Sequence, residues 1–249
     1  MQHFYVKNDK IEGHRLSLEG EDYNHCINVL RMKKGEAFIA CDESGMEYYC
    51  IIDSFENGVV NADISYRRAS EQELSCPVTI YQGIPKSDKL ELIIQKCVEL
   101  GAVRIVPVEM KRCIAKVDSS KAASKQKRWQ AIAEAAAKQC GRGILPEVGM
   151  PMTYTNAVKD AENADVKLLP YELADEISSM DETRKVFESI LPGQSVAVFI
   201  GPEGGFDENE VEKACKCGFK AVTLGKRILR TETAGLYIMS VLGYLLEGK

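Results

Sequence analysis

The chain has 249 residues, of which 45% are hydrophobic and 28% charged, and its net charge is −5, values that fit a globular protein of one or two domains. It has no run of ~20 apolar residues for a membrane span and no signal-peptide pattern at its start, so we expect a cytoplasmic protein. All three histidines lie in the first 25 residues and none of the nine cysteines forms a C-x-x-C pair, which argues against histidine catalysis and metal binding.

The first 72 residues have the pattern of a small all-β domain. Alternating runs such as EAFIACD and EYYCIID are separated by turn signals at Gly35, at Ser44-Gly45 and at Asn57-Gly58. The last of these dipeptides favours a β-hairpin. Residues 22–32 interrupt the alternation with a helical pattern.

A polar segment follows this β-rich region. Residues 67–75 (RRASEQELS) have almost no apolar periodicity, so we expect a linker there. The segment places a domain boundary near residue 73, which divides the chain into an N-terminal domain, residues 1–72, and a C-terminal domain, residues 73–249.

After residue 77, strand and helix signals alternate. Residues 78–84 are predicted as a buried strand, residues 90–98 carry the apolar stripe of an amphipathic helix, and residues 103–109 are predicted as the next strand. Such a unit makes its two strands parallel. Further helices are expected at 120–139, 181–191, 207–217 and 232–247, and strands at 166–170, 196–200 and 221–224. The C-terminal region thus predicts an α/β fold with a mainly parallel sheet.

The charge is unevenly distributed along the chain. Residues 111–142, here called the basic segment, contain nine Lys or Arg and two acidic residues, a local balance of +7. Such a segment can contact phosphates even in an acidic protein, because the local field decides what binds. A solvated helix face is the alternative.

The sharpest motif is IGPEGGF at residues 200–206, between a predicted strand and a helix that Asp207 and Glu210 can cap. Ligands of α/β sheets bind at this end of the strands. The central Glu203 would repel phosphates, so the loop favours a ligand with ribose hydroxyls and a positive centre, such as S-adenosylmethionine. A tight turn without a ligand is the alternative.

A second strand–loop–helix motif, LGKRILRTETA, covers residues 224–234. Thr231 or Thr233 can serve as the N-cap of the last helix, with Glu232 in its first turn. Arg227 and Arg230 have no comparable structural role, so we expect them to bind an anionic group of a cofactor or of RNA.

These two motifs, together with RWQAIAEAAAKQCGR at residues 128–142, resemble the RsmE family of ribosomal RNA methyltransferases, and HCINVLRMKKGE near the N-terminus resembles that family's PUA-like β-barrel. The resemblance implies an RNA-binding barrel at residues 1–72. It also implies a SPOUT methyltransferase domain at 73–249 with a C-terminal trefoil knot. Family members are homodimers, and the last helix, apolar at Ala234, Ile238 and Leu242, can supply part of that contact.

The family resemblance further implies a cofactor, S-adenosylmethionine, held in the knot. We expect its pocket to be formed by Leu169, Tyr171, Gly201, Pro202, Glu203, Gly204, Gly205, Leu224, Gly225, Arg227, Ile228, Leu229, Arg230 and Thr231. The implied reaction methylates N3 of a specific uridine in 16S ribosomal RNA of the small subunit, without a metal. Arg230 is the candidate that orients the uracil or stabilises its anion, and Glu232 is the candidate proton acceptor.

RNA contacts are expected from basic residues of both domains, namely Arg31, Lys33, Arg112, Lys116, Lys125, Arg128 and Arg142. Trp129 can stack a base but is more simply explained as a core residue. Two other functions fit the same sequence. One is a SPOUT ribose 2′-O-methyltransferase, and the other is a noncatalytic RNA-binding factor for ribosome assembly.

Overall fold

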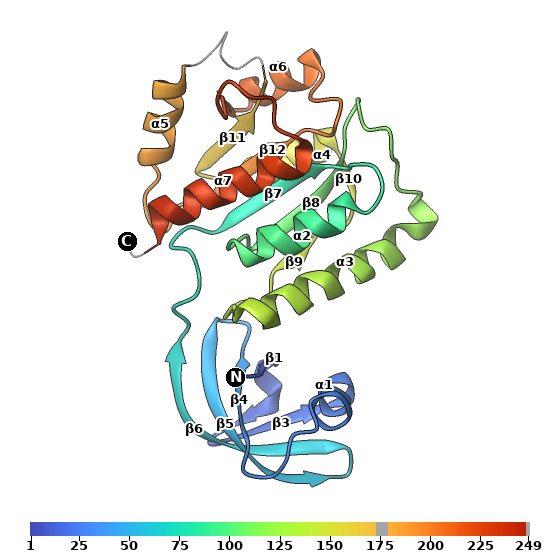
Figure 1. Ribbon diagram of the computed structural model, residues 1–249, viewed down its shortest axis with the longest axis vertical. Coiled ribbons are helices and arrows are strands. Elements are labelled where there is room, and N and C mark those ends of the chain that lie inside the picture. Colours follow the sequence, from blue (N-terminus) through green and yellow to red (C-terminus); the bar gives the residue numbers. More distant parts are fainter. Residues whose placement is uncertain (173–178, 248–249) are drawn as a thin grey trace. The chain divides into compact units, whose positions relative to one another are not determined.

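The computed structural model describes residues 1–172 and 179–247 (Figure 1). The chain divides into two compact units. The first contains Met1–Glu73 and Ala137–Leu145, and the second contains Leu74–Ala136 and Pro146–Lys249. Residues 137–145, which the sequence assigned to the C-terminal domain, thus pack with the N-terminal unit.

The first unit is built on a six-stranded mixed sheet in the order β1-β4-β5-β6-β3-β2. Its elements are β1 (His3–Tyr5), β2 (Ile11–Glu12), β3 (Arg15–Glu19), α1 (Gly20–Asn24), β4 (Ala37–Cys41), β5 (Met46–Glu56) and β6 (Val59–Ala69). β1 pairs with β4 in parallel, and the other pairs are antiparallel.

The predicted hairpin at Asn57-Gly58 is confirmed. It joins β5 to β6, and both turn residues have positive φ, 51° and 79°, as a type I′ turn requires. Two register shifts in this pair mark β-bulges, which bend long strands. The unit's core packs around Phe4 and Phe38, whose rings meet edge to face at 5.3 Å.

Two local predictions for the first unit were wrong in part. The helical pattern over residues 22–32 is a short α1 followed by a π-helical turn, His25–Val29, rather than one helix. The expected linker begins later than residue 67, because β6 continues to Ala69. Arg68 is held in this strand by the buried carboxylate of Glu47, at 3.0 Å.

Arg142 has a structural role in the first unit and not the predicted RNA contact. Its side chain is 3% exposed. Its Nε donates to both carboxylate oxygens of Glu73, at 2.8 and 2.9 Å, and Nη2 donates to the same carboxylate. Glu73 also accepts from the backbone N–H groups of Gly143 and Ile144. A guanidinium paired in this way cannot reach a phosphate, because burial removes it from solvent.

The second unit contains a seven-stranded sheet in the order β10-β8-β7-β12-β11-β13, with β9 also paired to β8. Its strands are β7 (Val78–Gly83), β8 (Arg104–Glu109), β9 (Glu147–Val148), β10 (Met152–Thr153), β11 (Val166–Pro170), β12 (Val196–Ile200) and β13 (Lys220–Val222). Every described pair is parallel, as the alternating pattern predicted.

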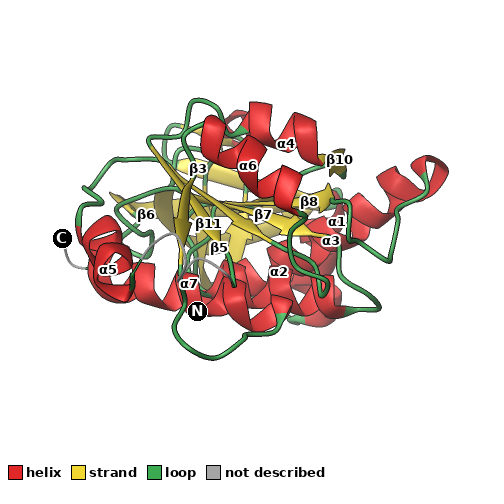
Figure 2. Cartoon of the chain, turned by 90° about the horizontal axis from the view of Figure 1, so that it is seen from above, coloured by secondary structure: helices red, strands yellow, loops and turns green. Residues whose placement is uncertain are grey.

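Helices cover both faces of this sheet. They are α2 (Lys89–Glu99), α3 (Ser119–Cys140), α4 (Tyr154–Asp160), α5 (Met180–Glu188), α6 (Glu208–Lys216) and α7 (Thr231–Leu246). Figure 2 shows α4 and α6 on one face, with α2 and α7 on the other. The sequence missed β9, β10 and α4, because two-residue strands and a seven-residue helix give no periodic signal.

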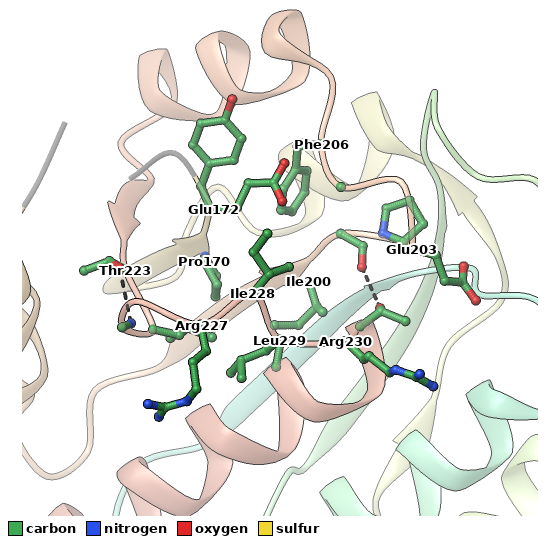
Figure 3. A pocket seen from close by; sticks show the side chains of 18 of the residues that line it. Pro170, Glu172, Ile200, Glu203, Phe206, Thr223, Arg227, Ile228, Leu229 and Arg230 are labelled. Carbon is green, nitrogen blue, oxygen red and sulfur yellow. Dashed lines mark hydrogen bonds between the residues drawn. The ribbon is translucent and has the colours of Figure 1, made fainter. Parts of the chain in front are cut away.

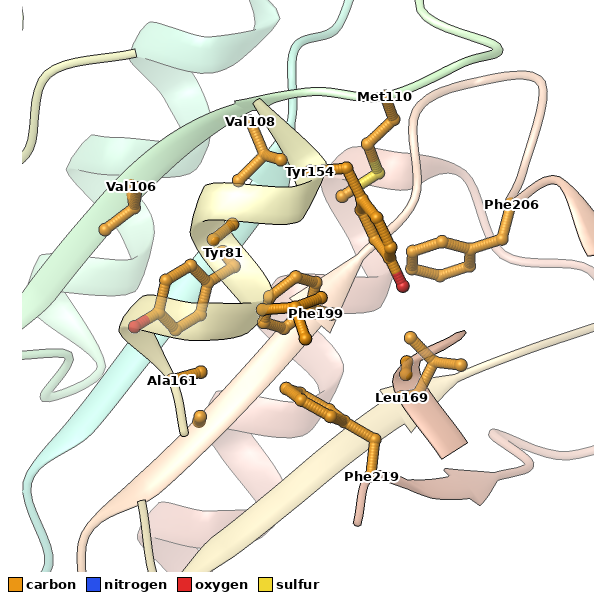
Figure 4. Packing of buried hydrophobic residues seen from close by; sticks show 14 of the residues in the cluster. Tyr81, Val106, Val108, Met110, Tyr154, Ala161, Leu169, Phe199, Phe206 and Phe219 are labelled. Carbon is orange, nitrogen blue, oxygen red and sulfur yellow. The ribbon is translucent and has the colours of Figure 1, made fainter. Parts of the chain in front are cut away.

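Phe199 of β12 lies at the centre of the core beneath α4 and α6 (Figure 4). Its ring stacks on Tyr81 of β7 at 4.6 Å and meets Tyr154 and Phe219 edge to face. These aromatic contacts fix β12 against its neighbours, and they support the loop that follows the strand.

The buried cysteines behave as core residues. All nine cysteines are free thiols, and five of them are buried. Burial raises the pKa of Cys97 to about 12, so this thiol stays protonated and unreactive at neutral pH. Trp129 is also buried, at 6% exposure, as the simpler interpretation predicted. Among the described residues, no helix is both long and apolar enough to cross a membrane.

We predict that Arg142→Met destabilises the protein by about 2–3 kcal/mol, because it leaves the half-buried Glu73 carboxylate without its cation. Urea denaturation followed by circular dichroism measures the loss. The double variant Arg142→Met/Glu73→Met should be less destabilised than the single variant. Arg184→Met, which breaks an exposed ion pair with Asp181, is the control and should cost under about 0.5 kcal/mol. A loss as small as the control's would contradict the structural role of Arg142.

Candidate functional site

A pocket of about 480 Å³ opens at the carboxyl ends of the central parallel strands (Figure 3). Its walls come from the segments that follow β11, β12 and β13, and from the first turns of α2 and α7. This is the edge at which α/β sheets bind ligands, because the loops diverge there. The pocket therefore lies where the two glycine-containing motifs predicted a site.

The loop after β12 is fixed at its far end by α6. Asp207 and Glu210 form the predicted capping box. The buried Glu210 also accepts a hydrogen bond from the backbone N–H of Lys111, at 2.8 Å. The Lys111 ammonium lies 2.8 Å from Asp207 and is the main reason that the pKa of Asp207 falls to about 2. These bonds hold the loop against the segment after β8.

The start of the loop packs so closely against the end of β7 that Gly83 there cannot carry a side chain. A Cβ on Gly83, at the end of β7, would lie 2.7 Å from the backbone nitrogen of Pro202. Gly205 has a φ of +67°, a conformation that favours glycine. The loop conformation is thus set by its neighbours as much as by its own sequence.

Thr231 ties three segments together beneath the pocket. Its hydroxyl donates to the carbonyl oxygen of Gly201 at 2.6 Å and accepts from Gln82 Nε2 at 2.8 Å. Gln82 is fully buried and donates to Gly83 as well. The expectation that Thr231 caps α7 was wrong, because the N-cap residue is Arg230 and no side chain makes the cap bond.

One end of the pocket carries a cluster of three charged side chains. Lys89 Nζ lies 3.2 Å from Glu232 Oε2 and 3.4 Å from Glu203 Oε1. Glu203 Oε1 also accepts from the backbone N–H of Lys86 at 3.0 Å. Burial opposes the ionisation of Glu203, but the backbone hydrogen bonds and Lys89 outweigh it and lower the pKa of this carboxyl. The cluster therefore carries one positive and two negative charges.

Most of the predicted cofactor residues line the pocket together. They are Tyr171, Gly201, Pro202, Glu203, Gly205, Leu224, Gly225, Arg227, Ile228, Leu229, Arg230 and Thr231. Two predictions fail. The side chain of Leu169 is fully buried in the core around Phe199, so Pro170 and Glu172 line the wall instead. Gly204 packs against Arg112 and not on the pocket.

Sequence reasoning also missed lining residues, of which Lys89 matters most. Its position was a detectable signal, because it follows the carboxyl end of the predicted strand 78–84 and so meets the same sheet edge as Glu203. Glu232, the candidate proton acceptor, is only 16% exposed at its side chain and is paired with Lys89.

Arg227 and Arg230 are exposed, and the described residues supply neither with an ion-pair partner. In Figure 3 the two guanidinium groups point away from the pocket on opposite sides. Both arginines are therefore accessible to an anionic group that approaches from solvent, and their binding of such a group stays a prediction.

The predicted RNA-binding residues differ in how far they are available. Lys116 and Lys125 of the second unit are exposed, as are Arg31 and Lys33 of the first. Arg128 is also exposed but paired with Glu91 at 2.8 Å. Arg112 is exposed and donates to the carbonyl oxygen of Gly204 at 3.2 Å, so it links the basic segment to the loop after β12.

The pocket lining combines three kinds of groups. Ile200, Phe206 and Ile228 offer apolar surface to a flat ring system. The carboxylates of Glu172 and Glu203 suit a positively charged centre, and the loop carbonyls and N–H groups suit a polar heterocycle. This combination of apolar, carboxylate and backbone groups fits a nucleoside that carries a positive charge. The negative charge of Glu203 would repel a phosphate group at this place.

We predict that Thr231→Val destabilises the second unit by about 1–3 kcal/mol, because the buried Gln82 amide and the Gly201 carbonyl lose a partner. Thermal and urea unfolding measure the change. Thr233→Val, at an exposed site on the same helix, is the matched control and should stay within about 0.5 kcal/mol of the parent. If both variants change the free energy of unfolding equally, the hydrogen bonds of Thr231 to Gly201 and Gln82 do not stabilise the unit.

Comparison with known proteins adds to these observations. A family model described as an RNA methyltransferase domain matches residues 72–243, and one described as an RNA methyltransferase PUA domain matches residues 18–54. The chain is 34% identical to ribosomal RNA small subunit methyltransferase E of Bacillus subtilis, covering 99% of this chain and 98% of that protein. The protein of the same name from Mesomycoplasma hyopneumoniae is 32% identical over 96% of this chain and 98% of its own length.

A solved structure agrees with the sequence matches. Ribosomal RNA small subunit methyltransferase E from Neisseria gonorrhoeae, bound to S-adenosyl methionine, superposes with a TM-score of 0.82 at 31% identity. The match covers 99% of this chain and 98% of that one. The chain therefore belongs to the RsmE family of small-subunit ribosomal RNA methyltransferases, with an N-terminal PUA-like domain and a C-terminal SPOUT domain.

Proposed function

We propose that this protein transfers a methyl group from S-adenosylmethionine to N3 of a specific uridine in 16S ribosomal RNA of the small subunit. The observation that carries the proposal is the pocket at the carboxyl ends of β11, β12 and β13, formed by IGPEGGF and LGKRILRTETA. Relatives over nearly the whole chain are named ribosomal RNA small subunit methyltransferase E, and the structure of one of them holds S-adenosyl methionine.

The lining residues suit the proposed cofactor. Apolar side chains of Ile200 and Ile228 would flank the adenine, while the backbone around Leu224 and Gly225 would meet its polar edge. Glu172 and Glu203 supply the negative charge that complements a sulfonium. The cofactor contributes an activated methyl group, so the chain itself has to align donor and acceptor and to help remove the N3 proton.

Arg230 is proposed to hold the uracil or its developing negative charge. Arg230 lines the pocket, and its guanidinium is exposed to solvent and always charged, which suits it to an anionic partner that approaches from solvent. Glu232 was the sequence-based candidate for the proton acceptor. Its pairing with Lys89 favours a different contribution, in which Glu232 positions the Lys89 ammonium.

RNA is proposed to bind the exposed basic residues. In the second unit these are Arg112, Lys116, Lys125 and Arg128, and in the first unit they are Arg31 and Lys33. Phosphate contacts by such residues position RNA without selecting its sequence, and their strength falls as salt rises. The choice of uridine must therefore come from groups nearer the pocket.

Two further properties are part of this proposal. Ile238 and Leu242, which the sequence offered for a homodimer contact, are fully buried within the chain's own core. The support for a homodimer comes instead from other side chains on α7, where Tyr237 is 36% and Tyr244 is 88% exposed. The trefoil knot implied by the family stays a prediction, and the position of β11 between β12 and β13 is compatible with it. The small subunit is a cytoplasmic particle in bacteria, so this substrate assigns the reaction to the cytoplasm.

The first test uses labelled S-adenosylmethionine and small ribosomal subunits from cells that lack this protein. Nucleoside analysis of the product should find the label in 3-methyluridine. Label in a 2′-O-methyl nucleoside would support the cofactor assignment but show that the acceptor is a ribose hydroxyl and not uridine N3. Absence of both transfer and cofactor binding would favour a noncatalytic RNA-binding protein.

Arg230→Ala is expected to lower kcat by about 10²-fold, because it removes a donor to charge that develops in the transition state. The dissociation constant for the cofactor should change less than about threefold, since the cofactor's other contacts remain. Single-turnover methylation and calorimetry measure the two quantities. Arg184→Ala on α5 is the control, and unchanged turnover in Arg230→Ala would remove this residue from the mechanism.

A further inference from the structure

The charged cluster of Lys89, Glu203 and Glu232 contains a lysine that lines the pocket and has no role of its own in the proposed function. An ammonium has three N–H donors, and Lys89 forms ion pairs with both glutamates. The side chain of Lys89 is 31% exposed and lines the pocket, so its remaining hydrogen-bonding capacity is accessible. The cluster therefore offers a donor and an acceptor beside each other.

The sheet order places this cluster on the side of the pocket that is nearer to the basic segment. β11 and β13 lie on one side of β12, and β7 and β8 lie on the other. Lys89 follows β7, and the basic segment begins directly after β8. Arg112 of that segment bonds to the carbonyl of Gly204, the residue next to Glu203. A base delivered along the basic segment would thus meet Lys89 and Glu203 before it meets the loop after β13.

The hydrogen-bonding pattern of this pair is the complement of one base edge. The imide edge of uracil presents the N3–H donor between two carbonyl acceptors. Lys89 Nζ lies 3.4 Å from Glu203 Oε1. At this spacing the ammonium can donate to a carbonyl oxygen of the uracil while the carboxylate accepts from N3–H of the same base. We propose that Lys89 and Glu203 together recognise the imide edge of the target uracil. This inference rests on the proposed function.

Glu203 and Glu232 have different roles in this recognition. Glu203 lines the pocket and its side chain is 26% exposed, whereas Glu232 is 16% exposed and is not part of the lining. Glu203 is also fixed by the Lys86 N–H, which presents its carboxylate in one orientation. Glu203 is therefore the acceptor for N3–H, and Glu232 is a positioning residue that holds Lys89 from the interior.

This arrangement selects uridine over cytidine. Cytosine has an unprotonated N3 and a 4-amino group, so the donor and acceptor positions are reversed. Its N3 lone pair would face the Glu203 carboxylate, and its amino group would face the Lys89 ammonium. Both contacts are repulsive, and a site built on hydrogen bonds rejects a mismatched partner more strongly than an apolar site does.

The test compares the binding of small subunits that carry uridine or cytidine at the methylated position, with S-adenosylhomocysteine present so that no transfer occurs. The parent protein should prefer uridine by at least about tenfold in Kd. Glu203→Gln should lower this preference to about twofold, because an amide can present either its donor or its acceptor. Lys89→Met should weaken uridine binding about tenfold, with little change in cofactor affinity.

Two controls separate recognition from folding. Lys89→Arg keeps the cation and should recover most of the uridine affinity. Lys96→Met removes a lysine that pairs with Glu99 on the same helix α2, away from the pocket, and should behave as the parent. Melting temperature and cofactor affinity are measured for every variant.

Two results would overturn the inference. One is a Glu203→Gln variant that keeps the parent's preference for uridine, and the other is a Lys89→Met variant that binds uridine subunits as the parent does. If these occur while the parent still forms 3-methyluridine, the proposed function stands and only the recognition role fails. A parent protein that transfers no methyl group overturns both.

Discussion

The parallel pairing of β7 with β12 is the constraint on which the rest of the second unit depends. The pairing aligns Val78–Gln82 with Val196–Ile200, residue by residue, although more than a hundred positions separate them in sequence. It brings Gly83 against Pro202, Gln82 beneath Thr231, and Lys89 beside Glu203. The aromatic cluster around Phe199 then fixes the register, because a shift by one residue would turn its side chains to the other face.

Local patterns were sufficient to predict most of the fold. Apolar runs and stripes predicted ten elements of the second unit to within three residues of their observed bounds. The capping box of α6 was predicted from Asp207 and Glu210 alone. The short segments β9, β10 and α4 were missed because tertiary pairing, and not periodicity, creates them. Likewise, the continuation of β6 through residues 67–69 depends on cross-strand contacts such as Arg68 with Glu47.

The direction of a side chain was harder to predict than its place in an element. Arg142 and Arg230 both belong to motifs shared with the RsmE family, yet the first is buried on Glu73 and the second is an exposed residue of the pocket lining. Leu169 was expected at the cofactor but faces the core, since alternate residues of a strand point to opposite faces. Lys89 was overlooked because its glutamate partners are distant in sequence, one in the loop after β12 and the other in the first turn of α7.

The hydrogen-bonded chain of Gln82, Thr231 and Gly201 has a consequence for how the protein matures. The residues that line the pocket lie between Lys89 and Ala234 in the sequence. A growing chain therefore cannot form the pocket until the start of α7 has been synthesised and Thr231 has bonded to Gln82 and Gly201. A ligand of this pocket therefore binds only the finished second unit, and by mass action it stabilises that state over every partly folded one.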